Sequence, residues 1–121
     1  MKLAIQGHPT RGKEVIQILE SLGGENRYDQ SGSNEEFVYF INNIGFIYSV
    51  TLYMCSTERK IYTLEEFETQ FPFKIGDKVT IVGLPDFPKT ITKIEWDCDE
   101  ILYSFEGLVN TWFGAKALKK V

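Results

Sequence analysis

The first hydrophobic segment of the chain, residues 3–5, is short and is followed by Gly7 and Pro9. A short apolar run that stops at glycine and proline is typical of a buried strand that leaves the core at a turn. Two glycines at residues 23–24 are a strong helix stop signal. Between these signals, apolar residues recur with the spacing of one helix face, at Val15, Ile18, Leu19 and Leu22. The pattern predicts a strand, a loop and a helix within residues 3–24.

Two apolar segments follow a polar loop at residues 25–36, and the second of them alternates with a period of two. Residues 37–41 are predicted to form a buried strand, and residues 46–54 a second strand after a turn at residues 42–45. In the second segment the even-numbered side chains are all large and apolar, whereas the odd-numbered ones are mixed. We expect these strands to form a hairpin, with one more short strand at residues 61–62.

Residues 63–66 have the pattern of a capping box, in which a threonine and a glutamate three positions later satisfy each other's backbone N–H groups. Thr63 is expected to accept from the N–H of Glu66, and the Glu66 carboxylate to accept from the N–H of Thr63. A helix is predicted from there to about Gln70, because Pro72 cannot continue it. The acidic residues of its first turn are ordinary stabilising charge at a helix N-terminus, not an acid site.

The last part of the chain consists of short apolar segments separated by glycine, proline and aspartate. Its predicted strands lie at residues 76–82, 89–96, 100–106 and 111–121. Four short strands at short intervals favour a small barrel. We therefore predict an α+β protein in which residues 1–72 form a β-α-β-β unit with a second short helix and residues 73–121 form the barrel.

Three stretches of this last part resemble the SH3-like barrels of the KOW type. They are FKIGDKV at residues 73–79, TITKIEWD at residues 90–97, and Trp112-Phe113 followed by Ala117-Leu118. The resemblance implies an SH3-like fold for residues 73–121. It says little about function, because such barrels serve as nucleic-acid binders, peptide binders and spacers. This copy lacks a clear basic face, which disfavours a nucleic-acid role.

The loop before the first helix carries the groups best suited to bind an anion. Backbone N–H groups at a helix start and the positive end of the helix dipole favour negative charge. Thr10 is the expected N-cap, with its hydroxyl accepting from an N–H near Gly12 or Lys13. Side chains with positive charge or hydrogen-bond donors would complete the site. The candidate ligand-binding residues are Gly7, His8, Thr10, Arg11, Gly12 and Lys13.

Residues 7–13 also match G-x-x-x-x-G-K, the first part of the phosphate-binding loop of nucleoside triphosphatases. The next residue is Glu14, where that motif needs a Ser or Thr hydroxyl to hold magnesium. A carboxylate there would repel the phosphate, so nucleotide hydrolysis is disfavoured. Two interpretations stay open: an ordinary strand-to-helix turn with solvated charges, or a phosphate or carboxylate site without hydrolysis.

Charge and composition narrow the class of partner. The 121-residue chain is 43% apolar and 25% charged, without a bilayer-length apolar run or a signal-peptide pattern, so we expect a cytoplasmic globular protein and no membrane partner. Its net charge of −4 argues against binding a nucleic-acid backbone. Residues 1–13 contain three basic and no acidic residues, which gives +3 at this end and −7 over the rest. A compact basic spot suits a small anion better than a long polyanion.

No arrangement of residues in the sequence identifies a reaction. Cys55 and Cys98 are far apart, which fits reduced thiols better than a disulfide framework or a zinc site. His8 is the only histidine, so no triad with a second base can be assigned. The acidic cluster at residues 97–100 is expected to be a solvated turn. We therefore expect no catalytic residues, no metal, no cofactor and no enzymatic activity.

The chain as a whole resembles a loose group of small uncharacterised proteins of phages and prophages of gut bacteria. The resemblance is carried by GHPTRGKEVIQILESLGG at residues 7–24, TLEEFETQFPFKIGDKV at 63–79 and KIEWDCDEILY at 93–103. It implies an accessory gene expressed in the cytoplasm of a bacterial host. Many such proteins act by binding, and some sequester nucleotide-derived immune signals.

These observations lead to two hypotheses of different class. The first is a non-enzymatic phage accessory protein that binds a small anionic or phosphorylated ligand and sequesters a nucleotide-derived signal; Tyr28 and Tyr39 are candidates for an aromatic wall against a nucleobase. The alternative is an interaction module that binds a host or phage protein through the SH3-like barrel. A chain rich in aromatic residues and strand edges can also form a homo-oligomer, and nucleic acid is not an expected partner.

Overall fold

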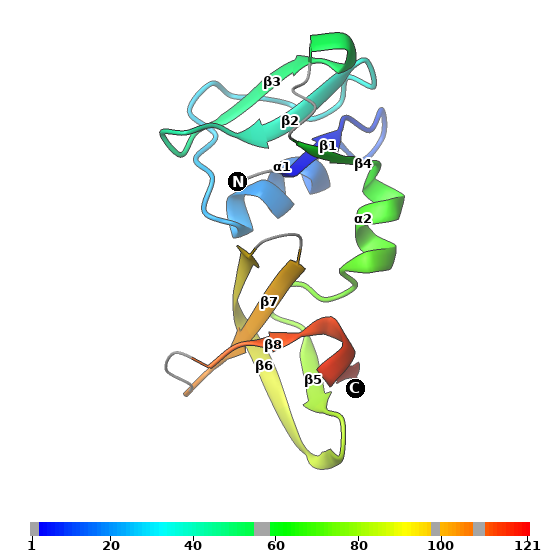
Figure 1. Cartoon of the computed structure of the whole chain (residues 1–121), viewed down its shortest axis with the longest axis vertical. Helices are drawn as coiled ribbons and strands as arrows, with labels where there is room; N and C mark the ends of the chain where they lie inside the picture. The colour runs from blue at the N-terminus through cyan, green and yellow to red at the C-terminus, as the bar shows by residue number, and fades with distance from the viewer. Residues whose placement is uncertain (1–2, 55–58, 98–99, 108–110) are drawn as a thin grey trace. The chain divides into compact units, whose positions relative to one another are not determined.

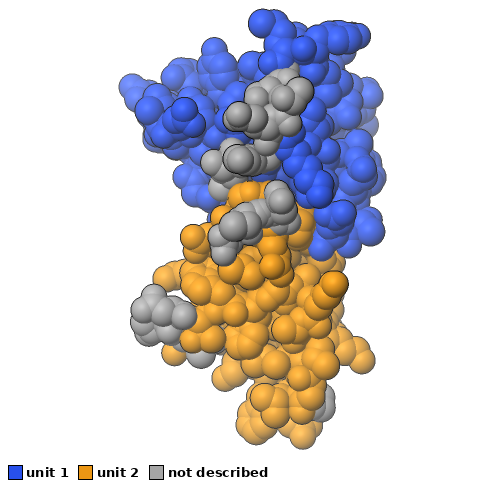
Figure 2. Space-filling view, in the orientation of Figure 1, with its two compact units in different colours: residues 1–70 blue, residues 71–121 orange. Residues whose placement is uncertain are grey.

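The structure is a computed structural model of the chain and describes residues 3–54, 59–97, 100–107 and 111–121. The chain divides into two compact units, Met1–Gln70 and Phe71–Val121, called unit 1 and unit 2 below (Figure 2). The boundary expected from the sequence lies just after Pro72. Both strands and helices are present, so the predicted α+β class is confirmed.

Unit 1 consists of one sheet with two helices. Its strands have the order β3-β2-β1-β4, in which β1–β2 and β2–β3 are antiparallel and β1–β4 is parallel. In chain order its elements are β1 (Leu3–Gln6), α1 (Gly12–Ser21), β2 (Phe37–Ile41), β3 (Ile47–Thr51), a 3-10 turn (Leu52–Met54), β4 (Lys60–Tyr62) and α2 (Leu64–Gln70) (Figure 1). The predicted bounds of β2 are confirmed, whereas the strand predicted at residues 46–54 ends at Thr51.

Both helices pack on the same face of this sheet. Helix α1 contacts β2 and β3, and α2 contacts β1 and β4. The strand residues on this face are buried, including Ile5 and Ile47. The Tyr62 ring meets the Phe67 ring of α2 edge to face, with 6.0 Å between the ring centroids, as is typical of such pairs. The opposite face holds a smaller buried cluster of Ala4, Val38 and Phe40. The sheet therefore separates a large core under the helices from a small one on its other side.

The capping box of α2 is confirmed. The N–H of Glu66 donates to Oγ1 of Thr63 at 3.1 Å, and the N–H of Thr63 donates to Oε1 of Glu66 at 3.0 Å. Hydrogen bonds from the backbone N–H of Thr63 first, and from its hydroxyl second, hold the pKa of Glu66 below its usual value. Two N–H groups that the helix start would otherwise leave unpaired are thus satisfied.

Unit 2 is a five-stranded antiparallel sheet with the order β8-β7-β6-β5-β9. Its elements are β5 (Lys78–Ile81), β6 (Leu84–Asp97), β7 (Glu100–Phe105), β8 (Phe113–Gly114), a 3-10 turn (Ala115–Ala117) and β9 (Leu118–Lys120). The first four strands form a meander, and the last returns to pair with the first. Among the described residues neither sheet closes on itself, so a closed barrel is not observed.

Strand β6 is longer than the sequence indicates. The sequence predicts a start at residue 89, but the strand begins at Leu84, directly after a tight turn in which Gly83 has a φ of +92°. The sequence suggests a break there because glycine, proline and aspartate lie between the predicted strands; of these, Pro88 lacks a backbone N–H. The ladder with β5 shifts register between Val79 and Ile81, and such irregular pairing accommodates a residue that cannot donate.

The core of unit 2 is aromatic. Phe73 lies edge to face on Tyr103, and Phe105 stacks on Phe113. Tyr103 is fully buried, and this burial raises its pKa to about 12. In the part of the chain that the structure describes, no helix is long and apolar enough to cross a membrane.

The N-terminus of α2 has a side-chain cap and that of α1 does not, and the effect of this difference on stability can be measured. We expect Thr63→Ala to lower the free energy of unfolding by about 1 kcal/mol, because it removes the cap acceptor for the N–H of Glu66. The matched variant Thr10→Ala should change it by only a few tenths of a kcal/mol, since the Thr10 hydroxyl does not cap α1. Urea unfolding of both variants checks this. Equal losses in the two variants would contradict it.

Candidate functional site

The loop between β1 and α1 is tied to the first residue of β2 and to the segment that precedes it. The N–H of Gly7 donates to the carbonyl of Phe37 at 3.0 Å, and the N–H of His8 donates to the carbonyl of Gly32 at 2.9 Å. Two backbone donors of the predicted anion-binding loop are therefore already used within the protein.

The His8 imidazole, rather than a hydroxyl, satisfies the next two N–H groups. Nδ1 of His8 lies 3.1 Å from the N–H nitrogen of Arg11 and 3.3 Å from that of Thr10. A backbone N–H only donates, so Nδ1 is the acceptor and Nε2 carries the ring hydrogen. Nε2 then donates to Oε1 of Glu65 at 2.9 Å. The prediction that Thr10 is the N-cap is wrong: Arg11 occupies that position, no side chain caps it, and the imidazole binds the adjacent donors.

Arg11 is held by two carboxylates. Its Nε donates to Glu14, one helical turn on, and its Nη2 donates to Oε2 of Glu68 at 2.7 Å. The hydrogen bond to Glu68 and then that to Glu14 raise the pKa of Arg11 above its already high value. The guanidinium charge is thus balanced inside unit 1. The Arg11 side chain therefore attaches the loop to α2, and its charge is paired with carboxylates rather than available to a ligand.

Close backbone packing explains the glycines of the loop. A Cβ on Gly7 would collide with the carbonyl of Asn34, and a Cβ on Gly12 would lie 2.6 Å from the carbonyl oxygen of Ser31. Gly32 faces Gly12 from the other side with a φ of +70°. Only glycine fits where two backbones approach this closely. The match to G-x-x-x-x-G-K therefore has a structural cause that needs no phosphate.

An open groove of about 890 Å³ runs along α1, from Gly12 to Glu20. One wall is the helix with the preceding loop, and the other is the segment 26–33. Most side chains along it are hydroxyls, amides or charged groups. The lining residues are Pro9, Thr10, Arg11, Gly12, Lys13, Glu14, Ile16, Gln17, Glu20, Asn26, Asp29, Gln30, Ser31 and Ser33.

The six predicted ligand-binding residues divide between two hollows. Four of them, at positions 10–13, line the groove. Gly7 and His8 line a smaller hollow of about 240 Å³ together with Glu65. Lys13 is exposed, and no ion pair of its ammonium occurs among the described residues. Of the basic side chains predicted to bind a ligand, it is the one that the groove leaves available.

Sequence reasoning missed the acidic partners from α2. Glu65 and Glu68 are three positions apart on the helix, and so are His8 and Arg11 in the loop; each contact spans 57 positions. The matching spacing is visible in the sequence. Its meaning depends on the parallel pairing of β1 with β4, which the sequence does not show. For the wall at residues 26–33, the sequence predicts only a polar loop.

Other candidates from the sequence lie away from the groove. Tyr39 is buried, and Tyr28 is exposed but packs edge to face on Phe46 and Tyr48. Neither lines the groove, so neither forms a wall for a base there. Within the described ranges no group of three or more His, Cys, Asp and Glu side chains is placed to hold a metal ion. Both cysteines, at positions 55 and 98, and the acid at position 99 lie outside those ranges.

Comparison with protein-family models, with curated proteins and with solved structures finds no match to this chain.

The contact between His8 and Glu65 predicts a pH effect. The backbone N–H of Glu65 and then the His8 side chain hold the pKa of Glu65 below its ordinary 4.5. A lowered pKa in the folded state stabilises the protein above the ordinary value, and this contribution is lost as the pH falls through the folded-state pKa. Glu65→Gln should therefore reduce stability at neutral pH and converge with the natural chain in acid.

Chemical unfolding at a series of pH values measures this difference. Glu36→Gln is the matched control, because the exposed Glu36 side chain makes no hydrogen bond or ion pair among the described residues. A gap between Glu65→Gln and the natural chain that stays constant with pH would show that the carboxylate does not act through its charge.

Proposed function

We propose that this protein is a non-enzymatic binding protein whose unit 1 holds a small anionic ligand in the groove beside α1. The observation that supports this best is the groove itself, which brings an exposed lysine, several hydroxyls and the start of a helix to one place. In the stronger form of the proposal, suggested by the resemblance to phage proteins, the ligand is a nucleotide-derived signal that the protein sequesters in a bacterial cytoplasm.

The anionic group of the ligand would lie near Lys13. The first N–H groups of a helix have no partner within the helix, and the helix dipole adds partial positive charge there. The hydroxyls of Ser31 and Ser33 bind each other at 2.9 Å, which leaves one hydroxyl hydrogen of the pair to donate to a ligand, and the Thr10 hydroxyl lies 3.3 Å from Nδ1 of His8. Arg11 is paired with two carboxylates, so the positive charge that the site offers to a ligand is that of Lys13, and the carboxylates of Glu20 and Asp29 line the same groove. A monoanionic group or a single phosphate suits it better than a polyphosphate.

The rest of the groove suits ligand groups that donate hydrogen bonds. Glu20 and Asp29 supply carboxylate acceptors, and Gln17 supplies an amide. Asn26 and Gln30 bind each other, which gives the outer wall a fixed shape: the amide of Asn26 donates to the carbonyl of Gln30 at 3.0 Å and accepts from its N–H at 2.8 Å. Ligands that combine an anionic group with hydroxyl or amino groups, such as phosphorylated sugars and nucleosides, would bind Lys13 through the anionic group and the carboxylate acceptors through the other groups.

A thermal-shift screen at low salt tests this proposal. Its probes are nucleotides, cyclic nucleotides, nucleotide sugars, sugar phosphates, inorganic phosphate and sulfate. A ligand at a hundred times its dissociation constant adds about 2.7 kcal/mol to the folded state. We expect a selective shift that Lys13→Gln abolishes and that Lys116→Gln, a change to an exposed lysine of unit 2, retains. Arg11 is a poorer target, because changing it releases the loop as well.

Two outcomes would contradict the proposal. A flat screen at millimolar ligand would remove it, and so would a shift that persists in Lys13→Gln, since the ligand would then bind elsewhere.

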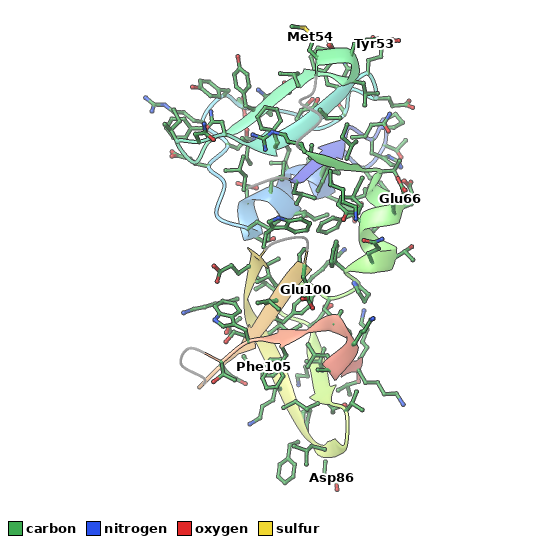
Figure 3. The ribbon with its side chains drawn as sticks, in the orientation of Figure 1. Tyr53, Met54, Glu66, Asp86, Glu100 and Phe105 are labelled. Carbon is green, nitrogen blue, oxygen red and sulfur yellow. The ribbon has the colours of Figure 1, made fainter. Side chains whose placement is uncertain are left out.

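We also retain the alternative that unit 2 is an interaction module with an SH3-like fold. A meander of four strands, followed by a 3-10 turn and a fifth strand beside the first, is compatible with that fold. Three large apolar side chains at the β5–β6 hairpin support an interaction role: Val82, Leu84 and Phe87 are each at least half exposed. Asp86 lies at the tip of the same hairpin (Figure 3). Exposed apolar groups gathered in this way are typical of binding surfaces.

A pull-down from bacterial lysate distinguishes the two functions. The interaction hypothesis predicts a stoichiometric protein partner that is lost with Phe87→Ser and kept with Lys13→Gln. Loss with Lys13→Gln alone would instead indicate that the groove of unit 1 is the working surface.

A further inference from the structure

The fold gathers lysine side chains on one part of the unit 2 sheet. Strand β5 lies between β6 and β9, and its pairing with β9 sets Thr80 directly opposite Lys119. Lys78 is two positions before Thr80 on the same strand. Because residues two apart on a strand and residues paired across strands share a face, Lys78 and Lys119 stand on the same face of the sheet. That face is the outer one, since the intervening Val79 is fully buried.

Two further lysines flank the β5–β6 hairpin. Lys89 follows the hairpin tip on β6. Lys116 lies in the 3-10 turn before β9, and this turn is joined to the hairpin because the N–H of Val82 donates to the carbonyl of Ala117 at 2.9 Å. These two lysines, together with those at positions 78 and 119, are called the lysine cluster below. All four are exposed, and none of them takes part in an ion pair among the described residues.

The lysine cluster gives this part of the protein a charge opposite to that of the rest. Residues 77–89 and 115–121 contain five lysines and two acidic residues, a net +3. The remainder of the chain contains eight basic and fifteen acidic residues, a net −7. The sequence does not show this cluster as a basic run, because its lysines come from three strands and a turn that the sheet brings together. A surface of this sign attracts acidic partners.

An apolar tip lies beside the lysine cluster. Val82, Leu84 and Phe87 are 63%, 50% and 62% exposed. The hairpin that carries them extends beyond the other strands of unit 2 (Figure 1). Leu84 and Phe87 each precede a proline, which restricts the backbone of the residue before it. A tip with little backbone freedom loses little entropy when it binds, so its apolar side chains are suited to anchor a partner.

We propose that this part of unit 2 binds an acidic segment of another protein. A large apolar side chain of that segment packs against Val82, Leu84 and Phe87, and its Asp and Glu side chains meet the lysine cluster. This inference rests on the interaction hypothesis for unit 2, and it adds the chemistry of the partner. It does not depend on ligand binding in the groove of unit 1.

Other anionic surfaces fit the same residues less well. Residues 71–121 contain no arginine, which is the side chain that best matches a pair of phosphate oxygens, and a phosphodiester backbone offers no apolar contact to the tip. A bilayer would meet Asp86 first, because this residue lies at the tip of the hairpin (Figure 3), and a carboxylate is costly in hydrocarbon. An acidic protein segment has neither disadvantage, since its backbone N–H groups can donate to Asp86.

Selection from a random linear peptide library, with the full chain as bait, tests the proposal. We expect enriched peptides in which Asp and Glu flank a large apolar residue. Fluorescence polarisation of such a peptide should show roughly tenfold weaker binding to Phe87→Ser. Lys116→Gln should weaken binding about threefold, by a margin that shrinks at high salt. Lys13→Gln, which removes one charge from unit 1, is the matched control and should bind like the natural chain. Circular dichroism verifies that each variant folds.

A charge exchange separates attraction from any structural role of the lysines. Lys89→Glu combined with Lys116→Glu should lose the acidic peptide and bind a version in which lysines replace its acids. Neutral or basic enriched peptides that still need Phe87 would overturn the acidic partner and leave the interaction hypothesis standing. Failure to enrich any peptide that depends on Phe87 would remove both. Tighter binding to oligo(dT) or to phosphatidylserine vesicles, or salt-sensitive self-association of the chain, would assign the surface to another occupant and reject the proposal.

Discussion

Parallel pairing of β1 with β4 sets each residue of the first strand opposite the residue 57 positions later, from Leu3 with Lys60 to Ile5 with Tyr62. Adjacent parallel strands have their C-terminal ends at the same end of the sheet, so the segments that follow the two strands begin side by side. The same offset continues beyond the strands, where His8 meets Glu65 and Arg11 meets Glu68. One register therefore places the two α2 carboxylates on the loop that precedes α1.

This arrangement pairs the basic side chains of the loop with carboxylates of α2. Exposed ion pairs contribute little to stability one at a time, so the value of these contacts lies in the single loop conformation that they select. With His8 and Arg11 engaged, the basic character inferred for residues 1–13 is largely neutralised. Lys13 lines the groove, and its ammonium has no ion pair among the described residues. A motif that looks like a strong anion site by composition thus offers a single unpaired cation beside several carboxylates.

Local features of the fold could be predicted from the sequence. The apolar content of residues 37–41 indicated the bounds of β2, and the pair Thr63 and Glu66 indicated the start of α2, because each signal lies within a few residues of the structure it specifies. The helical spacing at Val15, Ile18 and Leu19 likewise indicated α1.

Features that depend on distant contacts could not be predicted. Thr10 has the right chemistry for an N-cap, but the neighbouring N–H groups bind His8, whose ring position depends on Glu65. The glycines at 7 and 12 match a nucleotide motif locally, while their cause lies in the backbone at residues 31–34. The groove itself combines α1 with residues 26–33, and no periodicity in either segment indicates the other.

The 57-position span of the loop contacts also orders events during synthesis and folding. Helix α1 and the β2–β3 hairpin consist of local contacts, which form early and fast. His8 and Arg11 have no carboxylates from α2 until Glu65 and Glu68 have left the ribosome and β4 has docked beside β1. An incomplete chain can thus contain most of the sheet and still lack a fixed groove. The fixed groove therefore forms only at the end of unit 1 folding.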